Sequence, residues 1–301
     1  MIGKQLKATF RKPSVWVKLA LVSVLFILSM MEQIDITTAY ANSFGNRGNM
    51  TVITLIIHTF NYFYFYMDIL FIGFILLIPD IVKDPYTERE MLMCCGSRKR
   101  AGTYAIVKII CFSVLYVLWF IGLAFVVGSI GLHDFSLTWP HFLEIMQKQI
   151  KMQGMYATGV VNLAIGTLEY PTIVVLLLMM FRASLGFIFL GLLALLVTQV
   201  TAKTRNGIGI IAVLVGISGY VFLQPSILYW DNSRPMGQHI QIINIVKATI
   251  APLFSSCSVA DEFMPWMRYA LVTSAVLCVI TAIGVMAFYR KGDLGDADRD
   301  E

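Results

Sequence analysis

Few residues in this sequence have the type and spacing that enzyme chemistry needs. Gly216-Ile217-Ser218-Gly219 could place a serine nucleophile inside an apolar helix. A serine nucleophile needs a base within hydrogen-bond reach, but the apolar stretch 269–289 contains no histidine, and the chain's four histidines lie in or near its polar loops: His58, His133, His141 and His239. We therefore predict no catalytic residue and no enzymatic activity for this chain.

Nucleotide and metal sites are also not predicted. The segment from Gly96 to Thr103 has the wrong glycine spacing for a phosphate-binding loop and no lysine after its second glycine. His133 and His141 are separated by an interrupted segment, and the adjacent Cys94 and Cys95 would point in different directions on a helix. We expect no metal and no cofactor in this chain.

The composition excludes an ordinary water-soluble domain. Of 301 residues, 58% are hydrophobic and 14% are charged, and the mean hydropathy is +0.75. Soluble domains are about 45–50% apolar and about 25% charged, so the excess must face a bilayer. Five cysteines without regular spacing argue against a disulfide-bonded secreted scaffold. The first apolar run, 15–31, is not followed by a cleavage site and is expected to remain as an anchor.

The apolar residues form stretches long enough to cross the membrane as helices. A crossing needs about 20 residues, and no alternating pattern typical of barrel strands recurs. We therefore predict an all-α polytopic membrane protein in which 1–301 form one transmembrane domain with six crossings, at 15–31, 53–79, 104–127, 172–200, 207–223 and 269–289. The second and fourth stretches exceed a straight crossing, which predicts tilting, kinking or an interfacial portion, and a re-entrant segment near 155–182 stays an alternative.

The basic residues predict the orientation. With a cytoplasmic N-terminus, 16 of the 23 lysines and arginines fall on the cytoplasmic side, as the positive-inside rule requires. This asymmetry accounts for the net charge of +5 without a nucleic-acid partner. The cytoplasmic parts are then a basic segment 1–14, the loop 80–103 and an acidic tail 290–301, and the outer loops are 128–171 and 224–268.

The first long outer loop contains a predicted amphipathic helix. Thr138-Trp139-Pro140 is typical of a helix start, and apolar residues recur after it at helical spacing: Phe142, Leu143, Met146 and Ile150. This helix would lie on the outer leaflet or against the bundle, either as a structural cap or as part of an exit gate.

Asp68 is an ionisable residue near the middle of a predicted crossing. Its insertion costs about 2.5–3.5 kcal/mol, so it should face the bundle interior or a wet cavity, or be protonated. With Asn61, Tyr62, Tyr64 and Tyr66 it could line a polar and aromatic path; the alternative is an Asp that hydrogen-bonds between helices. Straight helices place Arg182 roughly 13 Å from the depth of Asp68, so we expect Arg182 to extend outward to the interface.

The loop after the second crossing has a distinctive sequence. Thr87-x-x-Glu90 forms a capping box, and Gly96 is a natural helix end. Between them, Met91-Leu92-Met93-Cys94-Cys95 is apolar but flanked by charge, and it is too short to cross a membrane. A short helix with adaptable methionines beside the membrane is suited to docking into a partner's groove. An ordinary solvated connector is the alternative.

This order of Glu88-Arg89-Glu90, an apolar turn and Gly96-Ser97-Arg98-Lys99-Arg100 resembles the intracellular loop of ABC-2-type permeases, the membrane subunits of bacterial ABC exporters. The resemblance implies that residues 88–95 form a coupling helix that docks on an ABC ATPase, with the basic residues behind it. The partner-docking residues would be Glu88, Arg89, Glu90, Met91, Leu92, Met93 and Arg98. The basic segment from Lys4 to Lys18 would correspond to an amphipathic helix leading into the first crossing.

The same resemblance implies the biological setting. The chain would be a multi-pass permease in the bacterial plasma membrane, in contact with membrane lipids and paired with a second permease copy or a related one. ATP and Mg²⁺ would bind the ATPase subunit, and the exported substrate would be a peptide, lipid or other amphipathic molecule. The long loop 128–171 departs from much of the family, so the subfamily is not assigned. The alternative function is a non-transporting receptor or an assembly or immunity factor whose outer loops bind a ligand.

Overall fold

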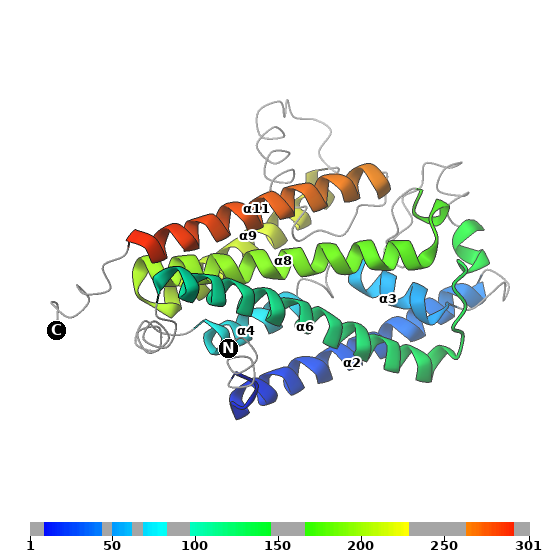
Figure 1. Cartoon of the computed structure of the whole chain (residues 1–301). Helices are drawn as coiled ribbons and strands as arrows, with labels where there is room; N and C mark the ends of the chain where they lie inside the picture. Colours follow the sequence, from blue (N-terminus) through cyan, green and yellow to red (C-terminus); the bar gives the residue numbers. More distant parts are fainter. Residues whose placement is uncertain are drawn as a thin grey trace.

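The computed structural model describes residues 9–43, 50–61, 69–82, 97–145, 166–228 and 263–291. In this part of the chain the regular structure is helical, without a strand. The α-helices, with the labels of Figure 1, are α2 (Pro13–Ser43), α3 (Val52–Asn61), α4 (Ile72–Ile81), α6 (Arg98–Leu132), α8 (Thr172–Thr201), α9 (Thr204–Leu228) and α11 (Phe263–Lys291). The all-α prediction is confirmed for the described residues.

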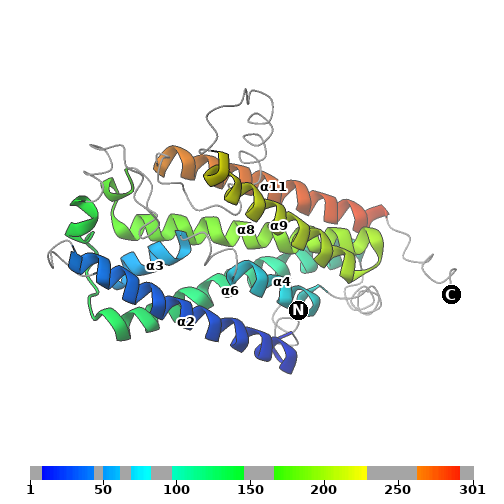
Figure 2. The ribbon, with the colours of Figure 1, turned by 180° about the vertical axis from the view of Figure 1, so that it is seen from behind.

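Helix α8 lies at the centre of the bundle. It contacts α3, α4, α6, α9 and α11, and both views show it between the α9–α11 pair and the remaining helices (Figures 1 and 2). Of its most apolar window 56% is buried inside the protein, compared with 22% for α11. A helix that is apolar all round must be covered on most sides, and α8 is the helix that other helices cover.

Among the described residues, four helices are long and apolar enough to cross a membrane. They are Pro13–Ala39 within α2, Lys99–Leu132 within α6, Thr172–Thr201 and Phe263–Tyr289 within α11. At 1.5 Å per residue each exceeds the roughly 30 Å hydrocarbon layer. A multi-pass membrane protein is therefore supported by four of the six predicted stretches.

The other two predicted stretches correspond to shorter apolar segments. The stretch 53–79 includes α3 and the apolar helical segment Ile69–Ile81, with residues 62–68 outside the description. The stretch 207–223 lies in α9, whose apolar described segment is Thr204–Gly216. By contrast, 172–182 belongs to the continuous helix α8, so this part of 155–182 is not a re-entrant segment; residues 155–165 lie outside the described residues.

Several helices extend beyond the predicted stretches. α2 continues from Met31 to Ser43 although Glu32 and Asp35 end the apolar run, because polar residues end a hydropathy stretch without ending a helix. α6 begins at Arg98 and ends at Leu132. The loops predicted at 80–103 and 128–171 are thus both shorter than predicted.

The predicted helix of the first outer loop begins where expected. Residues 141–145 are helical directly after Pro140, and Phe142 and Leu143 are buried in the core of the bundle. The indole of Trp139 donates to the carbonyl oxygen of Tyr170 at 2.8 Å. The described part of this segment packs against the bundle; Met146 and Ile150 lie outside the described residues.

Helices α8 and α9 form a tight hairpin. Ala202 ends α8 in the left-handed conformation, and Gly207 lies directly against the last turns of α8. A Cβ atom at Gly207 would lie 2.6 Å from both the Ala194 carbonyl oxygen and Thr198 Oγ1. Close approach of two membrane helices requires such a small residue.

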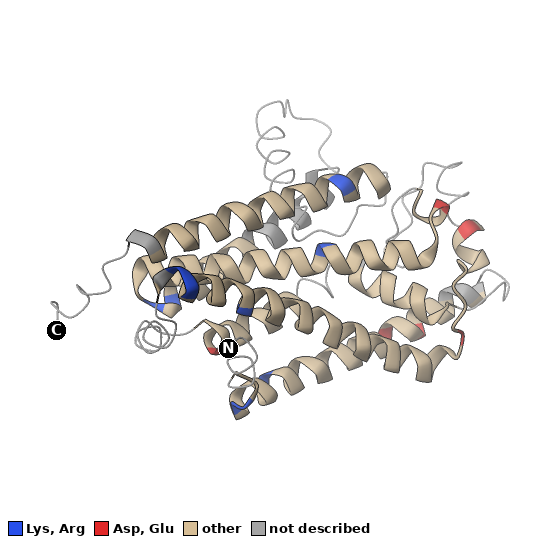
Figure 3. Ribbon diagram, viewed as in Figure 1, with Lys and Arg blue, Asp and Glu red and all other residues tan. Residues whose placement is uncertain are grey.

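Charge is distributed unevenly along the bundle. α2 begins, α4 ends, α6 begins and α11 ends at the same end, and the turn between α8 and α9 lies there too (Figure 1). Most of the described Lys and Arg positions lie at this end of the ribbon, whereas the Asp and Glu positions lie mostly at the other (Figure 3). We call it the basic end, with the residues Arg11, Lys12, Lys18, Lys99, Arg100, Lys108, Lys203 and Arg205.

Candidate functional site at the basic end

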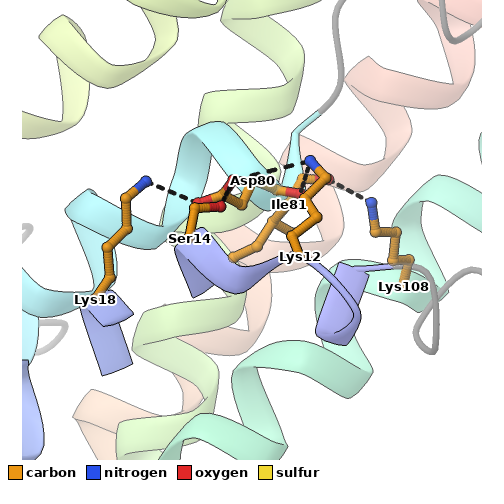
Figure 4. Close-up of polar contacts among 6 residues, drawn as sticks. All are labelled: Lys12, Ser14, Lys18, Asp80, Ile81 and Lys108. Atoms are coloured by element: carbon orange, nitrogen blue, oxygen red, sulfur yellow. Dashed lines mark hydrogen bonds and ion pairs between the residues drawn. The ribbon is translucent and has the colours of Figure 1, made fainter. Parts of the chain in front are cut away.

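The candidate site is the end of α4, directly before the segment 83–96, which lies outside the described residues. Asp80, in the last turn of α4, is held by the start of α2 (Figure 4). Lys18 Nζ lies 2.7 Å from Asp80 Oδ2, and Ser14 Oγ donates to Oδ1 at 3.0 Å. Lys12 Nζ is 3.8 Å from Oδ1. One carboxylate thus joins two helices through two cations and a hydroxyl group.

The start of α2 is well suited to hold an anion. Pro13 is the first residue of α2, a position that tolerates its missing N–H. Ser14 and Lys18 are four residues apart and therefore lie on one face of the helix. The carboxylate of Asp80 lies beside the first turn, where the helix dipole favours negative charge. With a side-chain exposure of 12%, Asp80 is largely shielded from solvent, which strengthens these contacts.

The last carbonyl groups of α4 are capped by two lysines, one directly before α2 and one in α6. Lys12 Nζ donates to the carbonyl oxygen of Asp80 at 3.4 Å, and Lys108 Nζ of α6 donates to that of Ile81 at 2.6 Å. The final carbonyls of a helix have no partner within the helix, and lysine near a C-terminus can satisfy them. Figure 4 shows both lysines converging on this end of α4. We call Lys12, Ser14, Lys18, Asp80 and Lys108 the α4 anchor.

The segment beyond the anchor returns to the bundle at Ser97. The extended backbone of Ser97 and its Oγ, which accepts from the backbone N–H of Arg100 at 3.3 Å, cap the start of α6. Arg98, Lys99 and Arg100 are therefore the first turn of α6. Their placement within a loop up to residue 103 was wrong because the N-cap serine was overlooked.

Most residues predicted to dock a partner lie outside the described residues. This applies to Glu88, Arg89, Glu90, Met91, Leu92 and Met93. Only Arg98 falls within the description, as the first residue of α6. The structure describes both points where segment 83–96 joins the bundle, at Val82 and at Ser97.

The predicted polar path is described only at its edge. Asn61 is the last residue of α3, and Tyr62, Tyr64, Tyr66 and Asp68 lie outside the described residues. Helix α3 itself buries several polar side chains where it packs near α2 and α8: Thr54, His58 and Thr59. Thr59 Oγ1 contacts Met30 Sδ at 3.6 Å.

Arg182 is buried in the bundle and does not extend outward as predicted. It is 1% exposed, and its guanidinium carbon lies 5.1 Å from the centroid of the Trp266 ring of α11. Arg182 is ten residues into α8, about 15 Å along the helix, where other helices cover α8. The prediction failed because Arg182 lies on a face of α8 that is buried in the bundle, whereas the neighbouring Phe181 is exposed. The indole face offers a cation–π contact in its place.

The α4 anchor was not predicted from the sequence. Lys12 and Lys18 were assigned only to the basic N-terminal segment and Lys108 only to the cytoplasmic charge, and no role was predicted for Asp80. Two features of the sequence could have indicated the contact. Asp80 is an acidic residue directly after the second apolar stretch, and Ser14 and Lys18 are spaced by one helical turn at the start of the first. Comparison with known proteins finds no matching protein-family model and no matching characterised protein.

Proposed function

We propose that this chain is the membrane-spanning permease subunit of an ATP-binding-cassette transporter that exports a peptide, a lipid or another amphipathic substrate. ATP and Mg²⁺ bind a separate ATPase subunit, and a second permease copy or a related permease completes the pathway. The complex lies in the plasma membrane of a bacterium. The proposal rests on the resemblance of residues 80–103 to a coupling loop, and the observation that carries it is the α4 anchor beside that loop.

A loop that receives force from a partner must be firmly attached to the helices it moves. Segment 83–96 leaves α4 directly after Asp80 and Ile81, which α2 and α6 hold, and it returns into α6 at the capped Ser97. A displacement of the segment would therefore move α2, α4 and α6 together. This is the rigid-body coupling that an ATP-driven change of access needs.

The proposed topology has six crossings and cytoplasmic termini. α2, α6, α8 and α11 are the four long crossings, α3 with α4 forms the second, and α9 forms the fifth. The concentration of Lys and Arg positions at the end where α2 begins and α11 ends supports this orientation (Figure 3).

The proposed translocation path runs beside α3, past Asn61, Tyr62, Tyr64, Tyr66 and Asp68. The buried polar side chains of α3 and the buried Arg182 of the neighbouring helix α8 support this position. Ionisable groups inside a membrane domain are expensive and usually serve function.

Docking is tested by purification from the native membrane. The wild-type chain should co-purify with a Walker-type ATPase. The double variant Leu92→Gln/Met93→Gln should lose this co-purification. Leu137→Gln, which changes an exposed leucine at the far end of the bundle, is the matched control and should retain the ATPase. A wild-type chain that purifies without any ATPase would favour the receptor or immunity function and contradict the proposal.

Coupling is tested separately with Asp80→Asn. The reporter is Leu137→Cys in a variant whose five native cysteines are replaced. In the complex, ATP with vanadate should change the rate at which maleimide labels this cysteine. Asp80→Asn should keep the ATPase bound but reduce the ATP-dependent change several-fold. An unaltered change would remove the α4 anchor from the coupling mechanism.

A further inference from the structure

A hydrophobic cavity lies between α2, α4 and α6, next to the α4 anchor. Its volume is about 340 Å³, and its walls are aromatic and aliphatic, with Phe10, Trp16, Leu19, Leu77, Tyr116 and Trp119 among them. On α6 the lining runs from Phe112 to Trp119, which is about 10 Å along the helix axis. The cavity is therefore elongated along the helices and has the size of a small ligand pocket.

The polar atoms of the lining are bonded within the protein. The indole N–H of Trp16 donates to the Phe10 carbonyl oxygen at 2.6 Å, and that of Trp119 donates to Ser23 Oγ at 3.0 Å. Tyr116 Oη donates to the Leu70 carbonyl oxygen at 2.8 Å. The donors of these three side chains are thus occupied, and the cavity is suited to hydrocarbon rather than to a polar molecule.

The cavity opens on the outside of the bundle. Trp16 and Trp119 are 48% and 42% exposed, and Leu115 and Leu118 of α6 are exposed beside them. The opening lies on α2 and α6, two of the four helices able to cross a membrane. A hydrocarbon chain can therefore enter from the surrounding lipid without crossing the protein.

Cations lie at the basic end of the cavity. Lys12 precedes the lining residues Val15 and Trp16 by three and four positions, about one helical turn. Arg11 is exposed next to the lining residue Phe10, and the side chain of Lys12 is 43% exposed. Asp80 is shared by Lys12 and Lys18. With Arg11, the group has three cations and one carboxylate, and positive charge is in excess.

We propose that this cavity binds one acyl chain of an anionic phospholipid, whose phosphate lies against Arg11 and Lys12. An apolar slot open to lipid with cations at one end matches the two parts of such a molecule. Basic pockets between membrane helices bind anionic headgroups in this way. The proposal is independent of transport, since it requires only the folded chain in a bilayer.

The test uses tryptophan quenching by brominated lipids. A variant retaining Trp119, with the other four tryptophans changed to Phe, is reconstituted in phosphatidylcholine vesicles containing brominated phosphatidylglycerol or brominated phosphatidylcholine. Phosphatidylglycerol should quench Trp119 at a lower mole fraction than phosphatidylcholine does. A variant retaining only Trp266, which lies beside Arg182 and not at the cavity, is the control and should show no headgroup preference.

Two substitutions separate the parts of the site. Arg11→Gln, which leaves the Lys12–Asp80 contact in place, should lower the preference of Trp119 for phosphatidylglycerol about fivefold, the effect of one basic residue at an anionic surface. Leu115→Phe narrows the cavity and should reduce quenching by both lipids, whereas Leu21→Phe, on an exposed α2 position away from the lining, should not.

Several results would overturn the proposal. Equal quenching of Trp119 by the two lipids, or a preference that survives Arg11→Gln, would show that no headgroup site exists. Quenching by neither lipid would show that another occupant, such as a second copy of the chain, covers the cavity. If the single-tryptophan variants do not fold, native mass spectrometry of the wild-type chain in mixed lipid decides: bound phosphatidylglycerol must exceed bound phosphatidylcholine.

Discussion

Lys18 Nζ and Asp80 Oδ2 are 2.7 Å apart although 62 positions separate the two residues in the sequence. Their contact joins the first turns of α2 to the last turn of α4. An exposed ion pair contributes about 0–1 kcal/mol, but Asp80 is mostly shielded, and removing one partner leaves the other poorly compensated. The contact is therefore a strong candidate for mutational analysis.

A double-mutant cycle on this pair should reveal coupling. Lys18→Gln and Asp80→Asn should each destabilise the folded protein, and together they should cost less than the sum by about 0.5–1 kcal/mol, as for residues in direct contact. The measurement is unfolding of the detergent-solubilised chain by SDS titration. Strictly additive effects would mean that the two side chains do not interact in the membrane protein.

Gly207 and Gly209 are a matched pair for testing the hairpin of α8 and α9. Gly207→Ala adds a methyl group against the Ala194 carbonyl oxygen and Thr198, and overpacking of this kind costs about 1–3 kcal/mol. Gly209 has no atom within 4 Å of an added Cβ, and Gly209→Ala should stabilise the helix by up to about 1 kcal/mol. In detergent, the melting temperature should be lower than that of the wild type for Gly207→Ala and higher for Gly209→Ala. Equal responses would contradict the close contact.

Ser97→Ala should loosen the start of α6. Loss of an N-cap side chain costs about 0.5–2 kcal/mol, and its effect should be confined to the first turn. Hydrogen exchange of the amides of residues 99–101 should accelerate several-fold in this variant. The control is Ser129→Ala, which removes a hydroxyl that donates to the Phe125 carbonyl oxygen near the other end of α6. It should leave the exchange of amides 99–101 unchanged. Equal acceleration of these amides in both variants would show that Ser97 is not a local cap.

Arg182 and Trp266 should be energetically coupled. A desolvated cation–π contact is worth about 2 kcal/mol, so Arg182→Met and Trp266→Leu should show a coupling energy of about 1–2 kcal/mol in unfolding experiments. Arg268→Gln, at an exposed position of the same helix as Trp266, provides the comparison and should show no coupling to Arg182→Met. A coupling energy of zero in this double-mutant cycle would show that the Arg182 and Trp266 side chains do not interact.

Hydropathy alone predicted the position of the main helices, because a helix in lipid must be apolar over its whole length. It did not predict their ends. α2 continues past Glu32 and Asp35 to Ser43. Hydropathy reports which residues favour lipid, whereas the backbone hydrogen bonds of a helix can continue through polar residues beyond the lipid. The start of α6 could have been found from Ser97, a residue type that favours the N-cap position.

Contacts between distant segments were less predictable. The depth of Arg182 could be predicted by counting residues along α8. Its burial could not, because burial depends on how the other helices pack around α8. The partners of Asp80 likewise come from α2 and α6. Each of those lysines also fits the predicted excess of basic residues on the cytoplasmic side, so the pattern does not specify which lysine pairs with which acid.

The two lysines that cap α4 also imply an order of assembly. Lys12 and Lys18 precede Asp80 in the chain, whereas Lys108 follows Ile81 by 27 residues. At a synthesis rate of about 5–20 residues per second, Lys108 emerges about 1–5 s after the end of α4. During synthesis α2 can therefore pair with α4 first, and Lys108 of α6 then binds to the pair of helices that has already formed.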